Sequence, residues 1–223
     1  MLLALDSSTA IASVALYDGK VAGEITWYSG RNHSVELIPQ ALSLLDLRRV
    51  RASDLVAIAA ATGPGSYTGL RVGLAAAKGL CLALEIPMIG ISSLDVLAEP
   101  HSGSCLPVRP ILDAGRKRYA TALYKQSDGR LVRTGPIEGR RMSEILADLA
   151  EQTLLCGDLD ECRESDVPSA ARLASPASSL RRAGFLAEIA WREYQAGRYQ
   201  DPGQVEAFYL AAGSQVEVHD HSR

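Results

Sequence analysis

The segment Asp6-Ser7-Ser8-Thr9 combines a carboxylate with three hydroxyls, directly after the apolar run at residues 2–5. A carboxylate at the end of a buried strand, followed by hydroxyls in a tight turn, can hold a hydrated Mg²⁺ and hydrogen-bond a phosphate. The same residues can instead only cap a turn, because Ser and Thr satisfy turn backbone groups in many proteins. A second carboxylate, Asp113, follows a similar apolar run, but the residues after it are basic.

A glycine-rich loop follows the apolar run at 55–61. Its residues are Gly63, Pro64, Gly65, Ser66, Tyr67, Thr68 and Gly69, with Arg71 two positions later. Such a loop can present backbone N–H groups to an anion at a helix N-terminus. It is not a P-loop, because no Gly-Lys-Ser/Thr follows at the required spacing. The alternative is a tight strand–helix connection in which Thr68 caps the helix.

Histidines and cysteines do not occur in the patterns of a metal or nucleophile site. Four residues after His33 the chain has Leu37, so the i, i+4 histidine pair of a helical metal site is missing. The four cysteines form no Cys-x-x-Cys, and no Gly-x-Ser-x-Gly is present. We therefore expect no catalytic residue, no metal and reduced thiols.

The charge balance excludes a strongly basic nucleic-acid binder, because 23 basic and 26 acidic residues give a net charge of -3. No apolar stretch is long enough to cross a membrane and no secretory signal is expected, so we expect a cytoplasmic location. The short basic runs are interpreted as solvated faces; they are Arg48-Arg49, Arg116-Lys117-Arg118, Arg140-Arg141 and Arg181-Arg182.

Hydrophobic periodicity predicts an α/β chain that positions these segments at strand ends and helix starts. Predicted strands cover 2–6, 12–17, 20–28, 55–61, 87–91 and 154–157, and predicted helices cover 33–47, 68–84, 142–152 and 178–196. Pro39 predicts a kink or a late start in the first helix. Residues 159–177 are expected to be mostly loop, and the C-terminus ends in a polar tail.

Small residues recur every four positions along the predicted helix 68–84, at Gly69, Gly73 and Ala77 and again at Ala75, Gly79 and Ala83. Such a stripe lets another helix approach closely. Glycine inside a helix costs about 1 kcal/mol relative to alanine, so a compensating contact is expected. The sequence leaves open whether that contact lies in the same chain or in another subunit.

An internal repeat predicts two lobes of the same fold. Asp113 follows Asp6 by 107 residues, and Ala122-Leu123-Tyr124 follows Ala15-Leu16-Tyr17 by the same 107 residues. Each copy then reaches an Asp-Gly turn. We expect an N-terminal lobe at 1–104 and a reduced C-terminal lobe at 105–223.

The serine turn, the glycine loop through Arg71, the segment His33-Ser34 and the run Gly90-Ile91-Ser92-Ser93-Leu94 together resemble the TsaB (YeaZ) family. The resemblance covers about residues 1–125. It implies the actin/Hsp70/sugar-kinase (ASKHA) fold with duplicated ribonuclease-H-like lobes. It also implies a role in making N6-threonylcarbamoyladenosine at tRNA position 37, as the non-catalytic paralogue of TsaD.

The resemblance further implies dimerisation with TsaD, binding of the ATPase TsaE to the complex, homodimerisation in isolation, and contact with tRNA only through the complex. Peptidase activity and a cofactor are not expected, and Asp6, Ser7, Ser8, Thr9 and Asp113 are interpreted as a phosphate-loop remnant. The expected partner interface comprises Leu37, Ala41, Leu44, Gly69, Val72, Gly73, Ala76, Ala77 and Leu80.

One position departs from the family pattern, because Arg118 stands where an acidic residue is expected. The alternative function is a small ATP-dependent phosphotransferase of the same fold, in which Asp6 would be the Mg²⁺ ligand or base.

Overall fold

The computed structural model describes residues 1–162 and 164–210, and the expected polar tail lies outside them. The chain forms two compact units. Unit 1 comprises Met1–Val96 and Arg181–Tyr209, and unit 2 comprises Leu97–Leu180 with Leu210.

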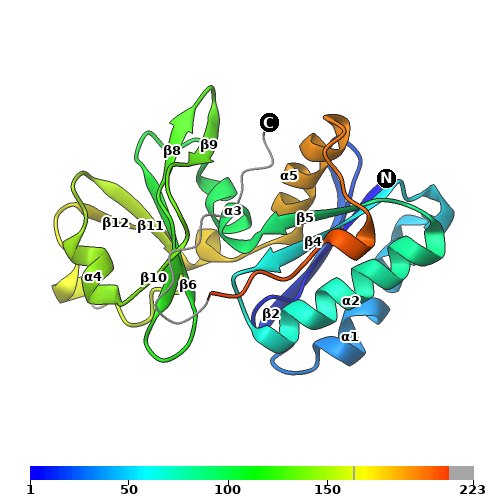
Figure 1. The fold of residues 1–223 in the computed structure, drawn as a ribbon, viewed down its shortest axis with the longest axis horizontal. Coiled ribbons are helices and arrows are strands. Elements are labelled where there is room, and N and C mark those ends of the chain that lie inside the picture. Colours follow the sequence, from blue (N-terminus) through cyan, green and yellow to red (C-terminus); the bar gives the residue numbers. More distant parts are fainter. Residues whose placement is uncertain (163, 211–223) are drawn as a thin grey trace. The chain divides into compact units, whose positions relative to one another are not determined.

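Unit 1 is a five-stranded sheet in the order β3-β2-β1-β4-β5, with helices on both faces (Figure 1). Strands β1, β2 and β3 are antiparallel, and β4 and β5 run parallel to β1. The strands are β1 (Leu2–Asp6), β2 (Ile11–Tyr17), β3 (Val21–Tyr28), β4 (Ala57–Gly63) and β5 (Met88–Ser92). The helices are α1 (His33–Arg48), α2 (Tyr67–Leu84) and α5 (Ala183–Gln195), while α3 (Ser93–Ala98) leads out of the unit.

The period-two alternation of the strands divides the core of unit 1 into two layers. Leu3 and Leu5 of β1 pack with α1 and α2 on one face of the sheet. Leu2 and Ala4 pack with α5 on the other face. Both layers are closed by helices, which explains why β1 and β4 are apolar at nearly every position.

The observed units differ from the predicted lobes 1–104 and 105–223, because the chain returns to unit 1 after leaving it. Helix α5 buries Ala183, Leu186 and Ala190 against the sheet formed by the first 92 residues. The apolar face of this helix was visible in the sequence, but which sheet it would cover was not.

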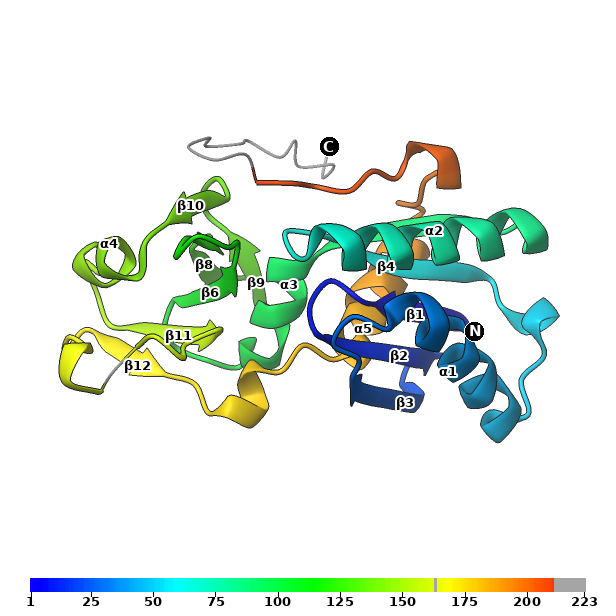
Figure 2. The ribbon, with the colours of Figure 1, turned by 90° about the horizontal axis from the view of Figure 1, so that it is seen from below.

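Unit 2 contains a sheet whose main path, β10-β7-β6-β11-β12, repeats the pattern of unit 1 (Figure 2). Its first three strands are antiparallel and the last two run parallel to the central β6. The elements are β6 (Val108–Asp113), β7 (Tyr119–Thr121), β8 (Tyr124–Ser127), β9 (Arg130–Arg133), β10 (Glu138–Arg140), α4 (Met142–Ala147), β11 (Thr153–Gly157) and β12 (Ala171–Leu173). The duplicated topology confirms the predicted α/β fold with ribonuclease-H-like lobes.

The repeat is not uniform along the chain. The turn Asp18-Gly19 joins β2 to β3, which lie on the main path of the first sheet. The turn Asp128-Gly129 instead joins β8 to β9, a hairpin off the main path of the second sheet. Unit 2 therefore contains an additional hairpin between the strands that correspond to β2 and β3.

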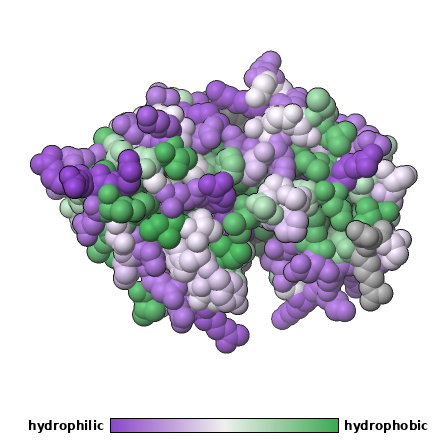
Figure 3. Space-filling model, turned by 180° about the vertical axis from the view of Figure 1, so that it is seen from behind, coloured by the Kyte–Doolittle hydropathy of each residue, from purple (hydrophilic) through white to green (hydrophobic). Residues whose placement is uncertain are grey.

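Within the described residues, no helix is long and apolar enough to cross a membrane. All four cysteines are free thiols. On the face shown in Figure 3, hydrophobic residues occur in small groups separated by hydrophilic ones.

Candidate functional site

The serine turn, residues 6–9, follows β1 and is closed by its own hydrogen bonds. Asp6 is 1% exposed. Its Oδ1 accepts hydrogen bonds from the Ser8 backbone N–H at 2.8 Å and from Ser8 Oγ at 2.5 Å. Ser93 Oγ, at the start of α3, reaches Ser8 Oγ at 3.3 Å. The capped-turn interpretation therefore describes Ser8 well.

The second oxygen of Asp6 is occupied by Arg181, which directly precedes α5. Arg181 Nε lies 3.2 Å from Asp6 Oδ2, and Arg181 Nη2 donates to Thr9 Oγ1. Both partners are buried, with Arg181 only 6% exposed. The interpretation of the run Arg181-Arg182 as a solvated face is therefore wrong for Arg181. Nothing local in the sequence marks this pair, because 175 residues separate its members.

The glycine loop, residues 63–69 with Arg71, packs directly on the serine turn. The Ser66 backbone N–H donates to the Ser8 carbonyl at 2.7 Å, and Ser7 Oγ donates to the Gly69 carbonyl at 2.9 Å. A Cβ atom at Gly69 would overlap the Ser7 carbonyl oxygen, and one at Gly73 would lie 2.5 Å from Ser7 Oγ. Glycine is therefore required at both positions by the approach of the turn to α2.

This contact answers two questions that the sequence left open. The close partner of the Gly69 and Gly73 stripe is the serine turn of the same chain. Near the start of α2 the Ser66 N–H donates to the Ser8 carbonyl and the Gly69 N–H donates to Ser66 Oγ, so neither of these two donors is open to an anion. The helix is capped by Ser66, whose Oγ accepts from the Gly69 N–H, and Thr68 lies within the first turn.

The outward side of the glycine loop carries an exposed aromatic and cationic group. The Arg71 guanidinium lies 4.0 Å from the centroid of the Tyr67 ring, and Arg71 Nε contacts Tyr209 Oη at 3.3 Å. The rings of Tyr67 and Tyr209 are 5.1 Å apart. Tyr67 is 54% exposed and Thr68 is also exposed, so these side chains are open to solvent.

His33 begins α1 and is buried near the serine turn. Its side chain is 4% exposed, and Nδ1 has no hydrogen-bond partner among the described residues. Burial lowers the pKa of this imidazole, while Glu36 and Asp6 act in the opposite direction. One turn later, Leu37 packs into the core. Among the residues that the structure describes, no group of three or more His, Cys, Asp or Glu side chains could hold a metal ion.

Asp113 lies in unit 2, at the position in β6 that Asp6 occupies in β1. Unlike Asp6 it is exposed, and its Oδ1 accepts from the Gly115 N–H at 2.7 Å. Arg116 and Lys117 both adopt positive φ angles in the turn that follows. Asp113 therefore supports a local turn, and no hydroxyl group accompanies it as in the first unit.

The expected partner interface needs correction for most of its residues. Leu37, Ala41, Leu44, Gly69, Gly73 and Ala77 are buried within unit 1. Val72, Ala76 and Leu80 are only partly buried, and they pack beside that stripe against the same core layer. The spacing identified a real helical stripe, but that stripe faces this chain's own sheet and serine turn.

The outer face of α2 carries the residues that a partner could contact. Ala75, Gly79, Leu82 and Ala83 are exposed there, and Leu82 is 69% exposed. A Cβ atom at Gly79 would meet nothing within 4 Å. Helix α1, which packs in the same core layer, exposes Val35 and Leu42. The spacing in the sequence showed Ala75, Gly79 and Ala83 as a second stripe, but the predicted interface included neither this stripe nor the exposed Leu82, Val35 and Leu42.

Comparisons with known proteins identify the family. Residues 21–146, more than half of the chain, match the family model described as "TsaD: tRNA N6-adenosine threonylcarbamoyltransferase". A Bacillus subtilis (strain 168) protein named "tRNA threonylcarbamoyladenosine biosynthesis protein TsaB" is 36% identical over 152 residues, which are 68% of this chain and 66% of that protein. The Escherichia coli (strain K12) protein of the same name is 32% identical over 58% of this chain and 51% of its own length. The chain thus matches between half and two thirds of the length of these relatives.

Among solved structures, "YeaZ from Pseudomonas aeruginosa" matches with a TM-score of 0.81 and 27% identity. This match covers 94% of the present chain and 99% of the other. It agrees with the repeated topology of the two sheets. The sequence relatives, the family model and the structural match together show that the chain belongs to the TsaB (YeaZ) family.

Proposed function

We propose that the chain is a non-catalytic scaffold subunit in the synthesis of N6-threonylcarbamoyladenosine at tRNA position 37. The observation that carries this proposal is the closed state of the Asp6 centre. Both carboxylate oxygens are engaged, one by Ser8 and one by the buried Arg181. A guanidinium at this distance neutralises the carboxylate and competes with a cation for the same oxygen.

The proposed role as a scaffold is supported by the exposed outer face of α2. Helix α2 presents small and apolar residues to solvent, and an apolar face of this kind is typical of a helix–helix interface. We propose that the outer face of α2, with Val35 and Leu42 of α1, binds TsaD. In the absence of TsaD the same face would pair with a second copy of this chain, because the two partners are related in fold. TsaE would join the heterodimer, and tRNA would be contacted through it.

The interface is tested by pull-down with TsaD from the same organism. Leu82→Arg places a charge on the outer face of α2 at a side chain that is 69% exposed. We expect affinity for TsaD to fall at least about tenfold, since a buried unpaired charge at an interface is costly. Val132→Arg on β9 is the matched control, because Val132 is also an exposed apolar residue, at 47%, and lies in unit 2. Equal retention of the Leu82→Arg variant and the control would contradict this interface.

The functional role is tested by reconstitution of tRNA modification. With TsaD and TsaE present, we expect modification to require this chain, and we expect Leu82→Arg to reduce it while Val132→Arg does not. Asp6→Asn distinguishes a scaffold from an enzyme. Modification that survives this change supports the scaffold, provided the variant is folded. Transfer activity from this chain alone would contradict the proposal.

The phosphotransferase alternative makes a different prediction. It requires Asp6 to bind Mg²⁺ or act as a base, and hence requires Arg181 to leave the carboxylate. We expect ATP with Mg²⁺ to cause no melting-temperature shift that depends on Asp6. A shift of several degrees that Asp6→Asn abolishes would favour the phosphotransferase.

A further inference from the structure

Unit 2 contains a cavity where its sheet opens. Strand β6 pairs with β7 from Ile111 to Asp113, but at Val108 it pairs with β8 instead. Arg109 and Pro110 lie at this change of partner, and the Thr121 hydroxyl donates to the Pro110 carbonyl at 2.8 Å. The cavity at this opening has a volume of about 510 Å³. This is within the range of about 300–1,000 Å³ that is typical of small-molecule sites.

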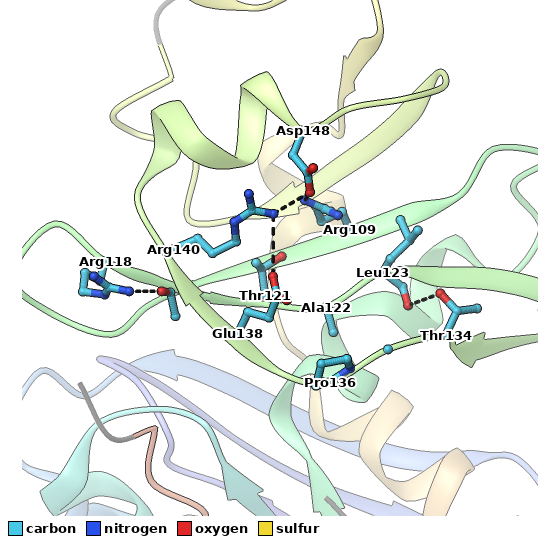
Figure 4. A pocket seen from close by; sticks show the side chains of 12 residues that line it. Arg109, Arg118, Thr121, Ala122, Leu123, Thr134, Pro136, Glu138, Arg140 and Asp148 are labelled. Carbon is cyan, nitrogen blue, oxygen red and sulfur yellow. Dashed lines mark hydrogen bonds and ion pairs between the residues drawn. The ribbon is translucent and has the colours of Figure 1, made fainter. Parts of the chain in front are cut away.

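Three guanidinium groups line the cavity, those of Arg109, Arg118 and Arg140. The carboxylates of the lining are those of Glu138 and Asp148. The lining therefore carries one positive charge in excess. In Figure 4 the Arg140 side chain lies between those of Glu138 and Asp148. Arg118 comes from the turn after β6 and donates to the Gly139 carbonyl.

Arg109 is the cavity guanidinium whose positive charge is least compensated. Asp148 Oδ2 is shared by two guanidiniums, with Arg140 Nη1 at 2.5 Å and Arg109 Nη1 at the longer distance of 3.5 Å. Arg109 is 9% exposed, and its Nε has no hydrogen-bond partner among the described residues. A buried cation without full compensation is costly, and buried N–H donors are nearly always paired. The arrangement lacks an acceptor that carries negative charge.

We propose that this cavity binds a small phosphate-bearing ligand through Arg109, Arg118 and Arg140. A phosphate supplies the missing charge and offers several oxygens to a set of planar guanidinium donors. None of the residues that line the cavity is aromatic, so the site offers no aromatic ring on which a nucleobase would stack. The phosphate group is therefore the recognised part of the ligand. The basic runs at 116–118 and 140–141 thus contribute Arg118 and Arg140 to a cavity, while Arg116, Lys117 and Arg141 are exposed, as expected of solvated faces.

The test is isothermal titration calorimetry on the full chain with inorganic phosphate and pyrophosphate. We expect saturable binding that weakens with added NaCl. Arg118→Gln and Arg140→Gln should each weaken it at least about fivefold, since each removes charge-assisted hydrogen bonds. Arg130→Gln on β9 is the matched control, because Arg130 is exposed and does not line the cavity. Circular dichroism establishes that the variants are folded. If Arg140→Gln does not fold, Arg118→Gln decides alone.

Four results would overturn the proposal. Phosphate and pyrophosphate could fail to bind at millimolar concentration, or Arg130→Gln could weaken binding as much as Arg118→Gln does. Succinate could also bind as tightly as pyrophosphate, which would reject phosphate as the recognised group. Binding of a short oligoribonucleotide without binding of either phosphate compound would assign the arginines to a polymer and reject a small ligand. The proposal is independent of the scaffold function, because TsaD is absent from every arm.

Discussion

The ion pair between Asp6 and Arg181 should contribute strongly to the stability of unit 1. Asp6 is 1% exposed and Arg181 is 6% exposed, so solvent screens their interaction little. Arg181→Met keeps much of the side-chain volume but leaves the Asp6 carboxylate buried without its cation. Removing one partner of a buried pair typically costs about 3–5 kcal/mol, and we expect Arg181→Met to fall in this range.

The neighbouring residue provides a matched control. Arg182 Nη2 contacts Glu24 Oε2 at 2.6 Å, but the Arg182 side chain is 50% exposed. Solvent reaches the Arg182 guanidinium, and Glu24, although only 9% exposed, also accepts the Gly184 N–H, so Arg182→Met should cost clearly less than Arg181→Met. The contrast between adjacent arginines separates the effect of burial from a general effect of lost charge.

Unfolding in guanidinium chloride, followed by tryptophan fluorescence, measures the stability difference between the two variants and reports on unit 1. The two tryptophans of the sequence are Trp27 and Trp191, and both lie in unit 1. The double variant Asp6→Asn/Arg181→Met tests the pair directly, because it removes both charges. We expect it to be more stable than the sum of the single effects predicts, by about 1–3 kcal/mol. A cost below about 1 kcal/mol for Arg181→Met, or additive effects in the double variant, would refute the argument.

Three further predictions concern glycine packing, a buried histidine and the thiols. Gly73→Ala should destabilise unit 1 by several kcal/mol, because its Cβ would lie 2.5 Å from Ser7 Oγ. The Cβ of Gly79→Ala would meet nothing within 4 Å, so this change should stabilise α2 by up to about 1 kcal/mol. Chemical denaturation compares the free energies of unfolding of the two variants. Burial lowers the pKa of His33, so the unfolded state binds its proton more tightly. The contribution of neutral His33 to stability is therefore complete above the unfolded pKa of about 6.5 and is lost as the pH falls below that value. His33→Gln should make the denaturation midpoint depend less on pH between about pH 7 and 5.5. Burial raises the pKa of Cys156 to about 12, so a thiol reagent should label exposed Cys105 rapidly and Cys156 only after unfolding, which mass spectrometry can follow; equal labelling rates in the folded chain would contradict this.

Much of unit 1 could be predicted because local and tertiary preferences agree there. Strands β1 and β4 are buried on both faces, so nearly every position in them is apolar and the runs are easily recognised in the sequence. Pro39 does not delay the start of the helix, since α1 begins at His33 and continues through the proline. Packing of Leu37, Ala41 and Leu44 against the sheet holds the helix on both sides of Pro39. Tertiary contacts here outweigh the loss of one backbone donor.

Unit 2 was harder to predict because its elements are short. Strand β12 has three residues, Ala171–Leu173, within a segment that was expected to be mostly loop. Helix α4 ends at Ala147, five residues before the predicted end at 152. A strand of three residues contains too few alternations to show a period, and its position depends on pairing with β11.

The candidate site was predicted in its parts but not in its connections. The serine turn and the glycine loop were both identified, yet their mutual contact joins residues about sixty positions apart, such as Ser7 and Gly69. The pair of Asp6 with Arg181 spans 175 residues. Composition and spacing describe neighbours along the chain. The first contact depends on how α2 packs on the serine turn, and the pair of Asp6 with Arg181 depends on how the chain returns to the sheet at α5.

The discontinuity of unit 1 also affects how the chain acquires its structure during synthesis. The ribosome releases the N-terminal residue first, so β1 to β5 emerge with one sheet face still without its helix. The whole of residues 97–180 must be translated before Arg181 can neutralise Asp6 and before α5 can cover Leu2 and Ala4. Unit 2 is contiguous through Leu180 and can fold during that interval. While more than eighty residues are translated, the nascent chain therefore carries an apolar sheet face without its helix and an Asp6 carboxylate without its cation, and exposed apolar surface of this kind is prone to aggregation.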